Sequence, residues 1–301
     1  NMYNTAVGAA AGQKVTTGVQ NTLIGGKAGD AITTANDNTG VGYQALTSTT
    51  TGHSNISMGT NAMNGNTTGN SNTGVGFQAL ANNTTASSNT GLGYNAGVNI
   101  TTGANNTAVG KGSLDACTTS TNNVAVGNDA GGGVTTGNGE NVFVGNRAGL
   151  GVTTGQQNII IGDNACANGT MTGNLNVFIG DNAGLAVTSG ANNTIIGGSA
   201  GDALTVGNSN TAVGQNALSL DTQGDLNTAI GIGALQSQNF TSSTDSYNTA
   251  VGGFAGGSNT TGQNNTFVGG LAGNSNTTGD NNTVMGSIAG DALTEGERNV
   301  A

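Results

Sequence analysis

Two aspartates stand where a pair of carboxylates could do chemistry. Asp163 and Asp181 occupy equivalent places in two successive copies of a short repeat. If the copies stack as neighbouring strands, we expect the two side chains to lie about 5 to 6 Å apart. Carboxylates at that separation can hold a cation, or act as acid and nucleophile on a glycoside. Two solvated loop acids are the simpler interpretation, so the pair is kept as a candidate metal site and no catalytic residue is assigned.

Three aromatic residues also recur at one place in the repeat. Tyr43, Phe77 and Tyr94 hold the same position as the two aspartates, in the third, fifth and sixth copies. Exposed aromatic rings in line could stack on sugars or seat a partner protein. Burial at a contact between subunits is the alternative interpretation. The three residues are therefore candidates for surface recognition.

One copy of the repeat is four residues longer than the others. The extra residues fall within 236–247, a segment that contains Phe240 and Tyr247. Insertions in repeat proteins loop out on one face and often carry binding residues. We therefore add Phe240 and Tyr247 to the recognition candidates, with a plain spacer as the alternative.

Other chemistry-bearing patterns are weak. Gly40-x-Gly42-x-x-Ala45 imitates a dinucleotide fingerprint, but no helix and no acidic ribose partner follow it. The single histidine, His53, lies in an expected turn with no cluster of cysteine or histidine around it. We predict no cofactor and no enzyme activity.

Composition narrows the partners further. Only 7% of residues are charged and the net charge is -10, so a broad nucleic-acid surface is not expected. Cys117 and Cys166 are three repeats apart, roughly 14 Å along a stack of strands, which is too far for a disulfide. Both are predicted to be small buried residues.

A 17-residue repeat positions all of these residues. Numbering each copy from its leading asparagine as column one, fourteen of the seventeen spacings are 17 residues, two are 18 and one is 21. A period this regular is typical of a stacked solenoid. The leading asparagines are Asn4, Asn21, Asn38, Asn55, Asn72, Asn89, Asn106, Asn123, Asn141, Asn158, Asn176, Asn193, Asn210, Asn227, Asn248, Asn265, Asn282 and Asn299.

Each column has its own chemistry. Column four is Val, Ile, Leu or Met in all 17 complete copies, and column two is Thr in 12 and Val or Ile in 5. Residues two apart share one face of a strand, so columns two to four predict a short strand with column four facing inward. Column five is always Gly, as expected at a turn with positive φ or a close backbone approach. The column-one asparagines are expected to form a hydrogen-bonded ladder.

Column three becomes bulky in the second half of the chain. With column four assigned inward, a large residue in column three makes the strand apolar on both faces, which is typical of a strand covered by a partner. We therefore predict self-association along the stack. The interface candidates are Phe143, Ile160, Phe178, Ile195 and Phe267.

Together these columns predict an all-β fold, a parallel β-solenoid or β-roll of about 17 coils. Gly makes up 56 of 301 residues, and no long window has a helical period, so helices are not expected. Proline is absent, which suits coils whose N–H groups all pair with a neighbour. We expect residues 1–301 to be one uncapped array, a slice of a longer fibre.

The motif Asn-Thr-Ala-Val-Gly-x-x-Ala, as in 4–11 and 210–217, resembles the repeat of YadA-like head domains in trimeric autotransporter adhesins. Related repeats occur in phage tail fibres and bacterial surface fibres. The resemblance covers every coil, although this unit is longer and column two is usually Thr instead of Val. It implies a left-handed parallel β-roll that packs as a homotrimer, and it transfers no ligand-binding residue.

Three functions compete at this point. The leading one is a non-catalytic shaft or head segment of an extracellular adhesive fibre or virion tail fibre, on a cell or virion surface. Such a fibre would reach a host or prey glycan or protein through a tip outside this segment. Direct binding of glycans or ice by the solenoid surface is the alternative, and a polysaccharide-degrading spike is a remote third.

Overall fold

The structure is a computed structural model that describes residues 3–301, and this part of the chain contains strands and no helix. Seventeen three-residue strands pair in parallel, one in each coil. The predicted all-β parallel β-solenoid of about 17 coils is therefore confirmed. None of the described residues forms a helix long and apolar enough to cross a membrane.

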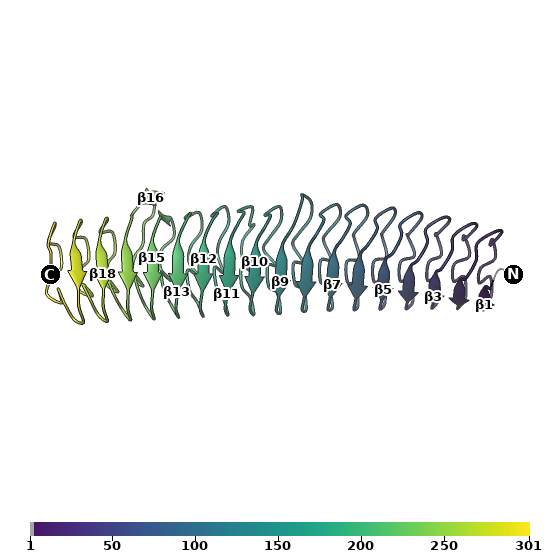
Figure 1. Cartoon of the computed structure of the whole chain (residues 1–301), viewed down its shortest axis with the longest axis horizontal. Coiled ribbons are helices and arrows are strands. Elements are labelled where there is room, and N and C mark those ends of the chain that lie inside the picture. Colours follow the sequence, from purple (N-terminus) through teal and green to yellow (C-terminus); the bar gives the residue numbers. More distant parts are fainter. Residues whose placement is uncertain (1–2) are drawn as a thin grey trace. The chain divides into compact units, whose positions relative to one another are not determined.

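The chain divides into two compact units, one ending at Thr154 and the other running from Gly155 to Ala301. Each unit is a stack of coils in its own right (Figure 1). The expectation that residues 1–301 form one array stays a prediction.

The first unit contains nine strands, each paired with its neighbour exactly one repeat away in register, as where Thr22 lies opposite Thr39. The strands are β1 (Thr5–Val7), β2 (Thr22–Ile24), β3 (Thr39–Val41), β4 (Ile56–Met58), β5 (Thr73–Val75), β6 (Thr90–Leu92), β7 (Thr107–Val109), β8 (Val124–Val126) and β9 (Val142–Val144).

The second unit repeats this arrangement and adds a small sheet from the longer copy. Its main strands are β10 (Ile159–Ile161), β11 (Val177–Ile179), β12 (Thr194–Ile196), β13 (Thr211–Val213), β15 (Thr228–Ile230), β17 (Thr249–Val251), β18 (Thr266–Val268) and β19 (Thr283–Met285). Two further strands, β14 (Gly224–Asp225) and β16 (Thr244–Asp245), pair with each other in parallel.

Glycine in column five lets the coils approach closely. Gly59 has a φ of +135°, and a Cβ atom built on it would lie only 2.5 Å from the carbonyl oxygen of Gly76 in the next coil. Real Cβ atoms do not approach an oxygen so closely, and an L side chain at this φ is strained. The predicted turn and close backbone approach at this column are confirmed.

The orientation predicted for the strand was wrong. From β2 onward, the middle residue of each three-residue strand, column three, is buried inside the coil, whereas column four is exposed or half-buried. The interface candidates of column three are therefore core residues, because the chain's own coil already covers them completely. Those fully buried residues are Phe143, Ile160, Phe178, Ile195 and Phe267.

Columns three and nine never both carry a large side chain in one coil, although both are small in some coils, as at Gly91 and Gly97. Where column three is large, as at Phe267, column nine of the same coil is Gly273, and a Cβ atom there would overlap the ring. Where column three is small, as at Ala229, column nine is Leu235. Phe267 and Leu235 are both fully buried. Columns three and nine therefore compensate each other in volume, as close packing of the interior requires.

The asparagine ladder is confirmed. The side-chain oxygen of Asn21 accepts hydrogen bonds from both the backbone nitrogen and the side-chain nitrogen of Asn38, each at 3.1 Å. The side-chain nitrogen of Asn38 also donates to the carbonyl oxygen of Gly52 at 3.0 Å. These amides are buried, so the ladder satisfies polar groups that water cannot reach.

Candidate functional surfaces

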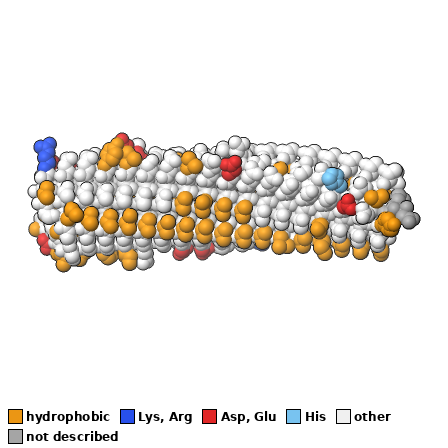
Figure 2. Space-filling model, in the orientation of Figure 1, with side chains coloured by type: hydrophobic (Ala, Val, Ile, Leu, Met, Phe, Trp, Pro, Cys, Tyr) orange, Lys and Arg blue, Asp and Glu red, His pale blue; other side chains and the backbone are white. Residues whose placement is uncertain are grey.

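Columns two and four form the outward face of the parallel sheet in each unit. Column four is apolar in every coil, and many of its side chains are well exposed, such as Leu92 at 47% and Met285 at 62%. In three coils, column two adds Ile56, Val124 and Ile159, which are also exposed. Figure 2 shows this face as rows of orange side chains over the strands. Contiguous apolar surface of this kind marks an interaction site.

The three column-six aromatics are exposed, as predicted. The Phe77 and Tyr94 rings, from neighbouring coils, stack with centroids 5.3 Å apart and planes 12° from parallel. Tyr43 lies two coils before Phe77, and Thr60 occupies column six between them. The structure therefore brings two of the three predicted rings together and leaves the third on the far side of a small residue.

Asp163 and Asp181 are exposed in column six of neighbouring coils of the second unit. The backbone nitrogen of Asn182 donates to the backbone oxygen of Asp163 at 3.0 Å, which shows that the two coils pair at this point. No group of three or more metal-ligating side chains occurs among residues 3–301. The cation site proposed for this pair stays a prediction.

A second acidic pair, which the repeat did not bring out, lies in the first unit. Burial first, and then the neighbouring Asp129 carboxylate, raise the pKa of Asp115. Asp129 in turn accepts a hydrogen bond of 2.9 Å from the side chain of Asn128. Asp115 stands in column ten and Asp129 in column seven. A comparison of equivalent columns in neighbouring coils therefore could not identify them as a pair.

The insertion at 236–247 is built around a buried carboxylate. Asp221 is fully buried and accepts hydrogen bonds from the side chain of Gln238 at 2.6 Å and from the backbone nitrogens of Phe240 at 3.1 Å and Gly224 at 3.0 Å. The nearby β14–β16 sheet projects beyond the other coils of the unit (Figure 1). The segment is thus an ordered part of the fold with its own polar centre.

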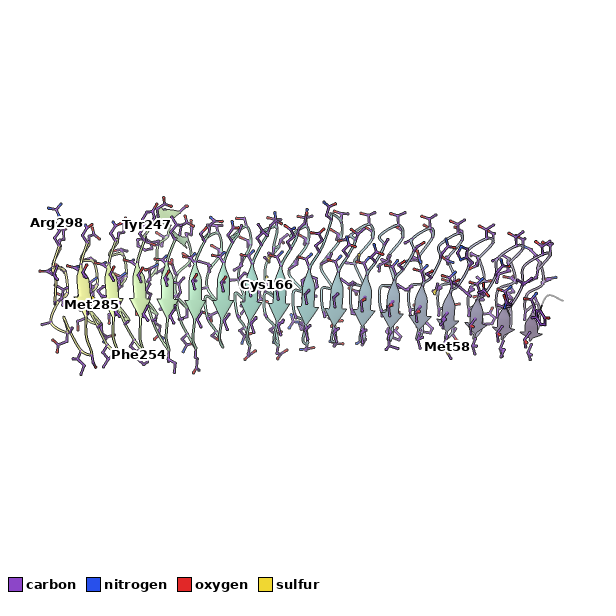
Figure 3. The ribbon with its side chains drawn as sticks, viewed as in Figure 1. Met58, Cys166, Tyr247, Phe254, Met285 and Arg298 are labelled. Carbon is purple, nitrogen blue, oxygen red and sulfur yellow. The ribbon has the colours of Figure 1, made fainter. Side chains whose placement is uncertain are left out.

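This arrangement corrects one recognition candidate. Phe240 is only 5% exposed, and its backbone nitrogen is held by the buried Asp221, so it offers no recognition surface. Tyr247, the last residue of the insertion, is 53% exposed, and Figure 3 shows it with Phe254 at the opposite edge of the same unit. Tyr247 stays a prediction as a recognition residue. Asp221 was the missed signal, because no other coil carries an acidic residue in column twelve.

Both cysteines are buried and free, as predicted. Burial raises the pKa of the Cys117 thiol and of the Cys166 thiol to about 12. Since only the thiolate reacts, both thiols stay protonated and inert at neutral pH. His53 is exposed in a turn, where its ring lies 3.5 Å from the Ser54 hydroxyl.

No protein-family model matches this chain, and no curated protein sequence matches it.

Proposed function

We propose that this chain is a non-catalytic shaft or head segment of an extracellular fibre, an adhesive fibre or a virion tail fibre, assembled from parallel copies of itself. The observation that carries the proposal is the outward column of apolar side chains. A second copy of the chain presents the same residues at the same spacing, so the two columns match coil by coil. The resemblance to YadA-like heads supplies the number of three chains and the extracellular setting.

The size of the column is sufficient for association. If two copies each bury the equivalent of one methylene per column-four side chain in the first unit, the gain is about 14 kcal/mol at ~0.8 kcal/mol each. The cost of bringing two chains together is about 4 to 15 kcal/mol. The nine residues of this column are Val7, Ile24, Val41, Met58, Val75, Leu92, Val109, Val126 and Val144.

The backbone suits a stiff support. In each unit the strands, the asparagine ladder and the column-thirteen threonines all bond from one coil to the next, as where the Thr84 hydroxyl donates to the carbonyl oxygen of Thr101 at 3.1 Å. Such a segment would hold a tip that recognises a host or prey cell-surface glycan or protein. In this proposal the contact between chains lies at column four. It replaces the contact predicted at column three, whose side chains are buried inside the coil.

Cysteine cross-linking tests the proposed packing. Changing Leu92→Cys puts a thiol in column four, where a parallel, in-register neighbour carries the same thiol close by. We expect rapid disulfide formation between chains under mild oxidation, seen as a doubled mass on a non-reducing gel. The native thiols do not interfere, because their raised pKa keeps them protonated.

The matched control is Thr102→Cys, an exposed position in the same coil but in column fourteen. It should cross-link at least roughly tenfold more slowly, since only column four is placed at the interface. Equal rates for the two variants would show that column four has no preferred contact between chains.

Binding of ice is a second candidate, favoured by one observation. In the first unit every coil carries an exposed threonine in column fourteen, so hydroxyl and methyl groups repeat about every 4.8 Å. These residues are Thr17, Thr34, Thr51, Thr68, Thr85, Thr102, Thr119, Thr136 and Thr154. In the second unit the column is broken by Val206 and Gln223.

Ice recrystallisation in the presence of the purified protein tests this second candidate. If the threonine column binds ice, crystal growth slows, and Thr85→Lys with Thr102→Lys restores it by breaking the array. Unslowed growth with the unmodified protein would remove the candidate.

A further inference from the structure

The column-six residues of coils three to six form a distinct exposed cluster in the first unit. Tyr43 is 52% exposed, Phe77 is 41% exposed and Tyr94 is 51% exposed, with Thr60 between the first two. Large aromatic rings are costly to leave in water unless they serve a contact. We call these four residues the aromatic row.

The aromatic row contains a gap bounded by two rings. A Cβ atom built on Gly26 would lie 3.4 Å from Cδ2 of Tyr43, so the Tyr43 ring leans on the coil before it. Phe77 stacks on Tyr94 in the coil after it. The Phe77 ring is therefore covered by Tyr94 on the side away from Thr60. The Tyr43 ring lies against Gly26, also on the side away from Thr60.

The width of this gap suits one flat ring. Coils three and five are two strand spacings apart, roughly 9.6 Å. A ring placed midway would lie about 4.8 Å from each aromatic ring, within the range of favourable ring contacts. Thr60 is exposed at the floor of the gap and supplies a hydroxyl group there.

The surroundings of the gap are polar but uncharged. Column seven beside the row carries the amides of Gln44, Asn61 and Gln78, and the side-chain oxygen of Asn61 is buried without a hydrogen-bond partner. Columns six and seven of coils three to six contain no charged residue. Amide donors and acceptors beside aromatic faces suit a ligand with both C–H faces and hydroxyl groups, which is the chemistry of a sugar ring.

We propose that the aromatic row binds one sugar ring of an extended, uncharged oligosaccharide between Tyr43 and Phe77, over Thr60. Tyr94 supports Phe77 from behind. The half-buried amides of Gln44 and Gln78 exchange hydrogen bonds with the sugar hydroxyls. All the residues involved belong to one unit of one chain, so the site does not depend on the proposed fibre assembly.

Calorimetric titration of the full chain with three β-1,4-linked hexasaccharides, cellohexaose, xylohexaose and chitohexaose, tests the site. We expect saturable binding of at least one of them. Tyr43→Thr and Phe77→Thr should each raise the Kd about tenfold, and both place in column six the residue that coil four already carries there. Ile232→Thr is the matched control, because Ile232 is an exposed apolar residue of the same column in the second unit, and it should leave the Kd unchanged.

The Thr60→Tyr variant distinguishes binding in a defined gap from non-specific binding to exposed aromatic surface. The added ring would fill the space between Tyr43 and Phe77, so binding should be lost although the aromatic area increases. Tighter binding by Thr60→Tyr would overturn the proposal, as would the absence of binding to all three sugars. A change in the native mass of Tyr43→Thr and Phe77→Thr without any sugar binding would show instead that the row is a contact between chains, which also overturns it.

Discussion

Replacing Asn72 by alanine is expected to destabilise the first unit by about 2 to 4 kcal/mol. Asn72 is fully buried, and its backbone nitrogen and side chain take part in four hydrogen bonds. Its backbone nitrogen donates to the side-chain oxygen of Asn55 at 3.0 Å, and its side-chain nitrogen donates to the same oxygen at 3.2 Å and to the carbonyl of Ala86 at 2.8 Å. Its own side-chain oxygen accepts from the backbone nitrogen of Asn89 at 2.9 Å.

Alanine would leave the Asn89 N–H buried without a partner, at a cost of about 1 to 3 kcal/mol. The Ala86 carbonyl would lose one of its two donors and keep the Asn83 side chain at 3.2 Å, a loss of about 0.5 to 1.5 kcal/mol. The measurement is urea unfolding followed by far-UV circular dichroism, with hydrogen exchange to locate the loss in the coils around Asn72. Asn82→Ala is the control, because Asn82 is exposed and bonds only to the exposed side chain of Asn99. It should change the free energy of unfolding by less than about 0.5 kcal/mol. Equal effects at Asn72 and Asn82 would contradict a stabilising ladder.

The second large effect is expected at Phe267. Phe267→Ala should cost about 3 to 5 kcal/mol, because it opens a cavity in a coil whose column nine is glycine. A Cβ atom on Gly256 of the preceding coil would lie 2.5 Å from this ring, so the neighbouring coil depends on the same side chain. Urea unfolding again supplies the measurement.

A compensating change makes this prediction specific. Adding Gly273→Leu to Phe267→Ala recreates the arrangement of Ala229 and Leu235 in coil fourteen. Leucine adopts the required positive φ there, as Leu235 does at 49°. The double variant should regain more than half of the lost stability, whereas Gly273→Leu alone should destabilise because it overlaps the ring. If the change in unfolding free energy of the double variant only equals the sum of the two single changes, the exchange of volume between columns three and nine is refuted.

The exchange between columns three and nine explains why the strand orientation was misjudged. Column four is always large and apolar, which is usually the mark of an inner face, whereas column three varies from Gly74 to Phe143. The large interior residues are shared among columns three, nine and twelve, as at Phe143, Leu46 and Ile32, so none of these columns is uniformly large. The period of two residues gave the two faces correctly but could not say which one was buried.

The features set by the backbone were predictable from the repeat. The glycine of column five lies where two coils approach closely, and the asparagine of column one bonds to the asparagine of the next coil. Both features depend only on the stacking of similar coils, so the repeat was sufficient to predict them. Positive φ at Leu46 and Leu80 was not predicted, because only their place in a turn, and not their residue type, requires it.

The candidate sites were predicted less well than the fold. Exposure of Tyr43, Phe77 and Tyr94 followed from their column, but the stack of the last two depends on rotamers that a repeat cannot specify. Burial of Phe240 depends on contacts with Asp221, which lies nineteen residues before it in the preceding coil. The consensus sequence of a single repeat does not contain contacts between residues of different coils.

The native mass of the purified chain, measured by light scattering, tests self-association most directly. One chain weighs 29.0 kDa, and the proposed fibre segment should have about three times that mass. Changing Leu92→Asp and Met58→Asp should reduce it to that of one chain, because both residues lie in the outward apolar column. A monodisperse mass of a single unmodified chain would contradict assembly through column four and leave that column without the partner proposed for it.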